Sequence, residues 1–168
     1  MKTFSLETLL DVETLPVKGP YRGELAVTEG EQAALADRFG FVELRGLDVA
    51  VEIARVGPDA WDIKGRLKAQ LVQPCIATGE SVPETVDFAL EERYVRAANK
   101  DDEVVVGLED SEPLVDNCIE LGEMVAQSLA LAANAWPRAV GAPGEFKTGD
   151  VEVLHPFASL GSLKKPKK

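Results

Sequence analysis

The sequence is poor in the residues that build metal sites, disulfide frameworks and most nucleophilic active sites. Its 168 residues include one histidine, His155, and two cysteines, Cys75 and Cys118, which lie far apart and form no CxxC motif. A structural zinc site needs four closely supplied ligands, and a Ser/His or Cys/His pair would have to recruit His155. We therefore expect no metal, no cofactor and no catalytic residue, and we predict that the protein is not an enzyme.

Long apolar runs are also absent. No stretch approaches the roughly 18 residues that a membrane-spanning helix requires, and the first ten residues lack the apolar segment and cleavage site of a secretory signal. The 45% hydrophobic content is nevertheless enough for the core of one domain. We expect a cytoplasmic protein with no membrane partner, whose cysteines stay reduced.

Positive charge is scarce outside the last five residues. The chain has 18 basic and 29 acidic residues and a net charge of −11. Four of the basic residues are Lys164, Lys165, Lys167 and Lys168, so residues 1–163 carry −15. A body this acidic repels a phosphate backbone at long range. The charge distribution therefore favours a basic protein partner over naked nucleic acid.

The first half of the chain predicts one helix and a run of strands. Thr28 and Glu31 have the spacing of a capping box, which predicts a helix over 29–39 that ends at Gly40. A short strand precedes it at 22–27. Apolar and polar residues then alternate in three stretches, separated by the turn signals Gly57-Pro58-Asp59 and Thr78-Gly79-Glu80. These stretches, at 47–54, 61–71 and 85–91, predict an antiparallel meander with one face in water.

The second half predicts a loop, a second helix and a tail. Residues 98–112 are acidic at both ends and suggest a mobile loop, in which Val104 to Val106 would form an edge strand. Apolar residues at three- and four-residue spacing predict a helix over 118–135, capped by Asn117 with Glu120 and ended by Pro137.

The predicted fold class is therefore α+β. It comprises an antiparallel meander with two packed helices, and closure of the sheet into a barrel-like form is left open. Residues 1–145 would form a single domain, and residues 146–168 a flexible C-terminal tail with a basic end.

Two basic groups are candidate binding surfaces. Lys64, Arg66 and Lys68 alternate along one predicted strand and so share a face, where they would contact RNA phosphate or an acidic protein. The interpretation we prefer is a solvated face whose charges pair across strands. The acidic candidates for that pairing are Glu52, Asp87 and Glu91. The lysine tail (Lys164, Lys165, Lys167, Lys168) would attract nucleic acid, or would be a disordered solubilising end.

The chain resembles the YceD family in three blocks that occur in the same order. These are Gly65–Glu80 (GRLKAQLVQPCIATGE), Glu112–Pro137 (EPLVDNCIELGEMVAQSLALAANAWP), which is the most specific, and Pro156–Leu163 (PFASLGSL). Ala33–Phe41 (AALADRFGF) resembles a weaker N-terminal block of that family.

The resemblance implies a non-catalytic role in the accumulation of 23S rRNA, and so in assembly of the large ribosomal subunit. Genes of this family commonly lie beside one for a large-subunit ribosomal protein. The implied partners are large-subunit precursor rRNA, a basic large-subunit ribosomal protein, or both. Many members carry further cysteines that would suit zinc, but here Ala77 and Thr78 follow Cys75 and residues 137–145 contain none. We therefore expect no metal in this chain.

Two other functions are open at the level of sequence. A metal-dependent hydrolase that processes rRNA would need a cation cluster among the acidic residues. Their clusters, at 91–92, 101–103 and 109–112, lack calcium-loop spacing and resemble ordinary loop charge. An interaction module unrelated to ribosomes is the other alternative.

Overall fold

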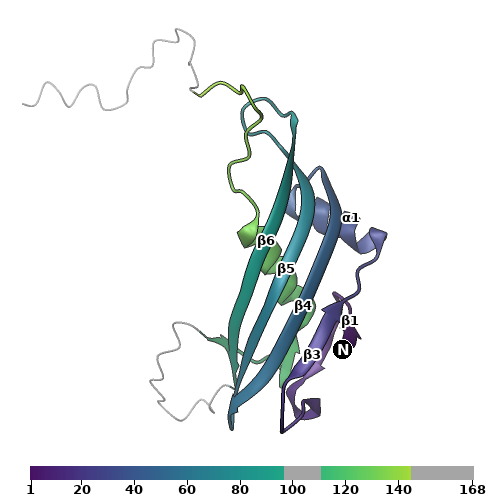
Figure 1. The fold of residues 1–168 in the computed structure, drawn as a ribbon, viewed down its shortest axis with the longest axis vertical. Helices are drawn as coiled ribbons and strands as arrows, with labels where there is room; N and C mark the ends of the chain where they lie inside the picture. Colours follow the sequence, from purple (N-terminus) through teal and green to yellow (C-terminus); the bar gives the residue numbers. More distant parts are fainter. Residues whose placement is uncertain (97–110, 145–168) are drawn as a thin grey trace, which may run out of the picture.

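The computed structural model describes residues 1–96 and 111–144 and shows a twisted sheet with helices on one side (Figure 1). The larger sheet has six strands in the order β1-β3-β4-β5-β6-β7, and β2 and β8 form a separate two-stranded sheet. The strands are β1 (Lys2–Phe4), β2 (Leu9–Asp11), β3 (Tyr21–Leu25), β4 (Glu43–Gly57), β5 (Ala60–Pro74), β6 (Ser81–Val95), β7 (Glu112–Pro113) and β8 (Cys118–Glu120). The helices are α1 (Glu29–Phe39), α2 (Leu121–Ala132) and the 3-10 turn η1 (Val12–Thr14).

The three longest strands, β4, β5 and β6, form the predicted antiparallel meander. Each has 15 residues, several more than the alternating pattern alone indicated. The β5–β6 pairing runs from Ala60–Val95 to Pro74–Ser81 without a register shift. The turns between the strands fall at the glycine-containing segments that the sequence indicated, and Gly79 has the positive φ of 76° that such a turn requires.

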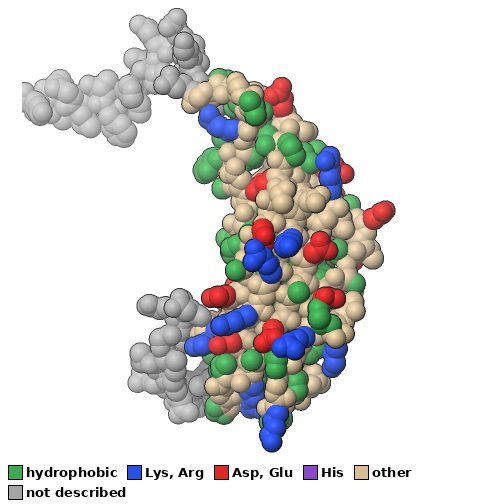
Figure 2. Space-filling view, in the orientation of Figure 1, with side chains coloured by type: hydrophobic (Ala, Val, Ile, Leu, Met, Phe, Trp, Pro, Cys, Tyr) green, Lys and Arg blue, Asp and Glu red, His purple; other side chains and the backbone are tan. Residues whose placement is uncertain are grey.

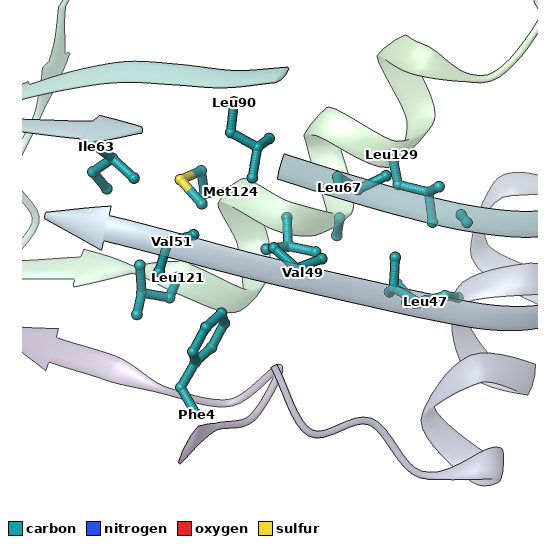
Figure 3. Packing of buried hydrophobic residues seen from close by; sticks show 14 of the residues in the cluster. Phe4, Leu47, Val49, Val51, Ile63, Leu67, Leu90, Leu121, Met124 and Leu129 are labelled. Carbon is teal, nitrogen blue, oxygen red and sulfur yellow. The ribbon is translucent and has the colours of Figure 1, made fainter. Parts of the chain in front are cut away.

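One face of the meander is the core, and α2 lies across it (Figures 1 and 3). The residues that point inward from the strands are buried, because alternate side chains of a strand share a face. Leu121, Val125 and Leu129 of α2 are completely buried against them. Each such side chain contributes roughly 1.5–3 kcal/mol when it leaves water. The strand side chains that face α2 include Val49, Val51, Ile63, Leu67 and Leu90.

Helix α1 matches its predicted bounds. The Thr28 hydroxyl accepts a hydrogen bond from the N–H of Glu31 at 3.2 Å, and the Glu31 carboxylate accepts one from the N–H of Thr28 at 2.8 Å. Gly40 ends the helix in the left-handed conformation, with a φ of 71°. The predicted capping box and glycine stop are therefore both confirmed.

Helix α2 begins later than predicted. Residues 118–120 form β8, which pairs with β2, so the helix begins at Leu121 rather than at 118. Asn117 does not cap it: Asp116 and Asn117 both have positive φ and form a turn, and the Asn117 side chain accepts from Arg96 instead. Glu120 occupies the N-cap position but makes no capping hydrogen bond. Pairing with a strand more than 100 residues away prevails over local helical periodicity here.

The α+β class is confirmed, but the sheet does not close into a barrel. Its outermost strands, β1 and β7, have three and two residues and pair in parallel with β3 and β6 rather than with each other. Strands this short leave the sheet open, and α2 covers the face that a barrel would enclose. Of the predicted acidic loop, Glu112 belongs to β7. Residues 97–110, with the predicted Val104–Val106 strand, and the tail from 145 onward lie outside the described residues.

Among the described residues, no helix has the length and apolar character needed to cross a membrane.

Candidate functional site

The predicted basic row lies on the outer face of the meander, because the residues that alternate with it on β5, among them Ile63 and Leu67, are buried on the face that α2 covers. Lys64, Arg66 and Lys68 are exposed on β5, as their alternation predicted. Their neighbours, however, alternate in sign. Lys64 lies between Glu52 of β4 and Glu91 of β6. Lys68 lies in the same way between an aspartate on each side, Asp48 and Asp87.

Ion pairs join several of these outer-face charges across strands. The Arg66 guanidinium donates to both carboxylate oxygens of Asp87, at 2.5 and 2.8 Å, and this contact lowers the pKa of Asp87. Arg93 binds Asp62 in the same bidentate way, and the pKa of Asp62 is lowered by that hydrogen bond. The cross-strand pairing of Arg66 with Asp87 is thus one that the alternating pattern indicated.

The outer face as a whole is close to neutral. It carries six basic and seven acidic side chains on β3 to β6, and Figure 2 shows the two signs interspersed over it. A phosphate backbone would meet alternating charges here rather than a basic strip. The basic members are Arg22, Arg45, Lys64, Arg66, Lys68 and Arg93, and the acidic members are Glu24, Glu43, Asp48, Glu52, Asp62, Asp87 and Glu91.

The acidity of the protein therefore lies on its other surfaces. The described residues contain 12 basic and 21 acidic side chains, so those outside the outer face number 6 and 14. That part of the surface carries −8, against −1 on the outer face. A cationic partner would therefore be drawn to these other surfaces, which include both helices and the sheet edges, rather than to the outer face.

An acidic pocket lies where the end of β6 meets β7, β8 and the start of α2. It has a volume of about 170 Å³, and three of its lining residues are glutamates. Glu112 comes from β7, Glu120 from β8 and Glu123 from α2, while Tyr94 and Met124 form part of the apolar wall. No lysine or arginine lines it among the described residues.

The electrostatics of this acidic pocket are unbalanced. Partial burial and the nearby Glu112 raise the pKa of Glu92 above its ordinary value. Burial raises the pKa of Tyr94 to about 12, and Glu92, Glu112 and Glu120 add to the rise. Both shifts disfavour further negative charge, with burial as the larger cause and the neighbouring carboxylates as the smaller one. Glu123 differs, because Arg38 is already paired with it and lowers its pKa. The repulsion therefore concerns Glu92, Glu112 and Glu120. A bound cationic group would relieve this repulsion.

Sequence reasoning did not identify this pocket. It assigned Glu120 to a helix cap and Glu112 to a solvated acidic loop, because local spacing is all that a single segment shows. The pocket depends on the β6–β7 and β2–β8 pairings, which join residues far apart in the chain. The one available signal was the density of acidic residues between 91 and 123, without a compensating cluster of basic ones.

Cys75 occupies a different kind of environment, at the turn after β5. The sulfur accepts a hydrogen bond from the N–H of Ala139 at 3.3 Å, and its side chain is buried. That bond, together with further hydrogen bonds from Thr78 and from the N–H of Ala77, lowers the pKa of the thiol to about 7. Cys118 is not beside it but lies in β8, so the structure does not bring the two cysteines together.

Metal-binding geometry is not found in the part of the chain that the structure describes. Within residues 1–96 and 111–144, no group of three histidine, cysteine, aspartate or glutamate side chains is placed to hold an ion. His155 and the lysines Lys164, Lys165, Lys167 and Lys168 lie outside that part.

Comparison of the chain with models of protein families, with curated proteins and with solved structures gave no match.

Proposed function

We propose that the protein is a non-catalytic factor for the accumulation of 23S rRNA, acting in large-subunit assembly by holding a basic ribosomal protein. The observation that carries the proposal is the distribution of charge: −8 on the rest of the described surface, which includes both helices, the turns and the sheet edges, against −1 on the outer face. Large-subunit ribosomal proteins are basic because they neutralise rRNA, and an acidic surface can occupy the same groups beforehand.

The resemblance to the YceD family supports the same role. Its most specific block, Glu112–Pro137, contributes β7, β8 and α2, and so supplies most of the lining of the acidic pocket. The part of the chain that resembles the family most closely is therefore also the part that supplies the three glutamates of the acidic pocket. The proposed setting is the cytoplasm, where ribosomal subunits are built.

Release of the partner follows from charge density. A few carboxylates on a folded surface bind cations more weakly than a continuous phosphate backbone does, because each phosphate contact also releases a condensed counterion. The protein would hold a basic segment away from incorrect contacts and yield it once rRNA is available. Because the carboxylates are exposed to solvent, the affinity for the basic partner is expected to fall as the salt concentration rises.

Direct contact of the outer face with rRNA has less support. Arg66 is already engaged by Asp87, and each of Lys64 and Lys68 has acidic neighbours on both sides. Hydrolysis of rRNA through a metal cluster also has less support, because the described residues offer no convergent ligand set.

The test is affinity purification of the tagged protein from its own cells at low and at moderate salt, with proteins and RNA both identified. Basic large-subunit proteins should be recovered, more of them at low salt, and should remain after nuclease treatment. If precursor rRNA is recovered and the ribosomal proteins are lost when it is digested with nuclease, the proteins were retained through RNA. That result would instead indicate that the protein contacts RNA. Recovery of neither at both salts would contradict the proposal.

A further inference from the structure

Strand β6 has an open edge along most of its length. On one side it pairs with β5 throughout, but on the other only Tyr94 and Val95 have a partner strand, β7. Within the described residues, the outward backbone groups of residues 81–93 have no backbone partner. A row of unpaired N–H and C=O groups is a template for another strand.

Two devices that commonly protect such an edge, lysine and a β-bulge, are absent from β6, whereas a third, inward-pointing charge, is present in Glu84 and Glu92. Proline is a further common device. Strand β6 has no lysine and no register shift against β5, and its one proline, Pro83, lies near the beginning. Phe88, in the middle of the strand, is 38% exposed although it points to the apolar side. The edge therefore offers both backbone groups and an apolar side chain.

The acidic pocket adjoins this edge, because Tyr94 of β6 is part of its lining. Strand β6 itself carries four acidic residues and one arginine, and that arginine, Arg93, is engaged by Asp62. Glu91 and Glu92 have no ion pair with a described residue. An occupant of the edge thus lies beside the acidic residues of β6 and, at the end near Tyr94, beside the glutamates of the pocket.

The negative charge of these residues selects the occupant. A second copy of the chain, paired antiparallel about Phe88, would place Glu84 of each copy directly opposite Glu92 of the other. Like charges directly opposite each other destabilise a strand pair. A segment that carries lysine or arginine at alternate positions has the opposite effect, because its charges complement the glutamates.

We infer that the open edge of β6 and the acidic pocket together bind an extended, basic segment of a partner protein by strand addition. This inference rests on the proposed function and adds the site and the mode of binding. Backbone hydrogen bonds to β6 hold the segment. Its inward side chains cover Phe88 with their aliphatic stems and place a cation near Glu112 and Glu120.

The probe for this inference is a short acetylated and amidated peptide of alternating lysine and valine, with a fluorescent label, followed by anisotropy. Its control is the same peptide with the central amides N-methylated, which removes the N–H donors of both strand edges and keeps the charge. Strand addition predicts that the methylated peptide binds at least about tenfold more weakly. It also predicts that the unmethylated peptide slows hydrogen exchange of amides in residues 81–93.

Two variants locate the site on the protein. Glu112→Gln with Glu120→Gln removes two pocket carboxylates that make no side-chain hydrogen bond to any described residue, and should weaken peptide binding at least about tenfold. The matched control, Glu24→Gln with Asp37→Asn, removes the same charge from two exposed positions elsewhere. It should change binding by less than about threefold. An equal loss of peptide affinity in both variants would show that only the net charge of the protein matters, and would overturn the inference.

Ala89→Pro tests the edge itself. Pro83 lies in β6, so its missing N–H is expected to face away from β5. Ala89 lies six residues further on and has the same orientation, so a proline there should block the open edge and keep the β5–β6 bonds. Binding of the peptide should fall to the level of the methylated control. Unchanged binding by a folded Ala89→Pro variant, or unchanged binding of the methylated peptide, would overturn strand addition.

The outcomes separate this inference from the function it rests on. If the peptide behaves as expected but cells yield no ribosomal protein, the site stands and the function fails. If Ala89→Pro and the Glu112/Glu120 variant both recover ribosomal proteins as well as the unaltered chain does, the function stands and this site is wrong. A dimer in sedimentation that dissociates with Ala89→Pro would assign the edge to a second copy and contradict the inference.

Discussion

Arg38 and Glu123 are 85 positions apart, and a bidentate ion pair joins them and so ties the two helices together. Two guanidinium nitrogens of Arg38 donate to the two carboxylate oxygens of Glu123, at 2.7 and 2.8 Å. Arg38 lies in the last turn of α1 and Glu123 in the first turn of α2. Each charge therefore also complements the dipole of its own helix, which favours cations at the C-terminus and anions at the N-terminus.

This pair predicts an acid-dependent loss of stability. The hydrogen bonds from Arg38 and Gln127 lower the pKa of Glu123 from 4.5 to about 2. A carboxyl whose pKa is lower in the folded state stabilises the fold above its unfolded pKa. That contribution is lost as the pH falls from 4.5 toward 2. Urea unfolding of Glu123→Gln should show a smaller loss over this range than the unaltered chain. Identical pH profiles would contradict the assignment.

Gly122 and Gly30 occupy the same position, the second residue of their helices, but predict opposite results. A Cβ on Gly122 would lie 1.7 Å from the carbonyl oxygen of Leu6, whereas one on Gly30 would meet only the Thr28 hydroxyl, at 4.0 Å. Gly122→Ala should lower the free energy of unfolding by about 2 kcal/mol or more, since backbone has to move. Gly30→Ala should stay within about 0.5 kcal/mol of the unaltered chain or stabilise it. Chemical denaturation of both variants measures the two free energies of unfolding, and equal values would contradict the close contact of Gly122 with Leu6.

The thiol of Cys75 predicts a second pH dependence of the stability, this time above neutral pH. Hydrogen bonds from Ala139 and Thr78 lower its pKa from 9.0 to about 7. The thiolate is therefore favoured by folding, so stability should rise as the pH increases from 7 to 9 and lose this increment as the pH falls through 7. The thiolate absorbance of a Cys118→Ser variant should titrate near pH 7. A midpoint near 9 would contradict the hydrogen-bonded geometry.

The outer face predicts a negative result. Lys64→Gln with Lys68→Gln makes this face more acidic but leaves the Arg66–Asp87 pair in place. If the partner is a basic protein held elsewhere, the amount of ribosomal protein recovered from cells should not fall. A loss of rRNA together with retention of protein in that experiment would show that the face contacts RNA directly.

The two tryptophans predict distinct fluorescence. Trp61 is 1% exposed, and the guanidinium groups of Arg55 and Arg96 lie 5.5 and 5.6 Å from the centre of its ring. Trp136 is 73% exposed. In Trp136→Phe the remaining emission should be blue-shifted and resist acrylamide, and in Trp61→Phe it should resemble indole in water. Similar quenching of both variants would contradict this placement.

Local patterns predicted the elements of this fold better than their ends. Helix α1 was placed to the residue because Thr28, Glu31 and Gly40 act within one or two turns of the chain. The inward face of β5 followed from simple alternation, and Trp61 and Leu67 on it are indeed buried.

What sequence reasoning missed depends on pairing between distant segments. The start of α2 was placed three residues early because β8 exists only through β2. The sheet stays open because its outermost strands, β1 and β7, are very short. The alternation of apolar and polar residues in the sequence does not reveal this. The acidic pocket needs four elements in register before its glutamates become neighbours.

The position of α2 in the chain has a consequence for synthesis on the ribosome. Strands β4 to β6 are consecutive hairpins, so their contacts are local and can form as soon as residue 95 has emerged. Their apolar face has no cover until Leu121–Leu129 follow. During that interval the nascent chain presents Val49, Ile63 and Leu67 to solvent, and these side chains are what chaperones bind. Truncation before Leu121 should therefore yield a chain with a formed but uncovered sheet, which aggregates unless the missing helix is supplied in trans.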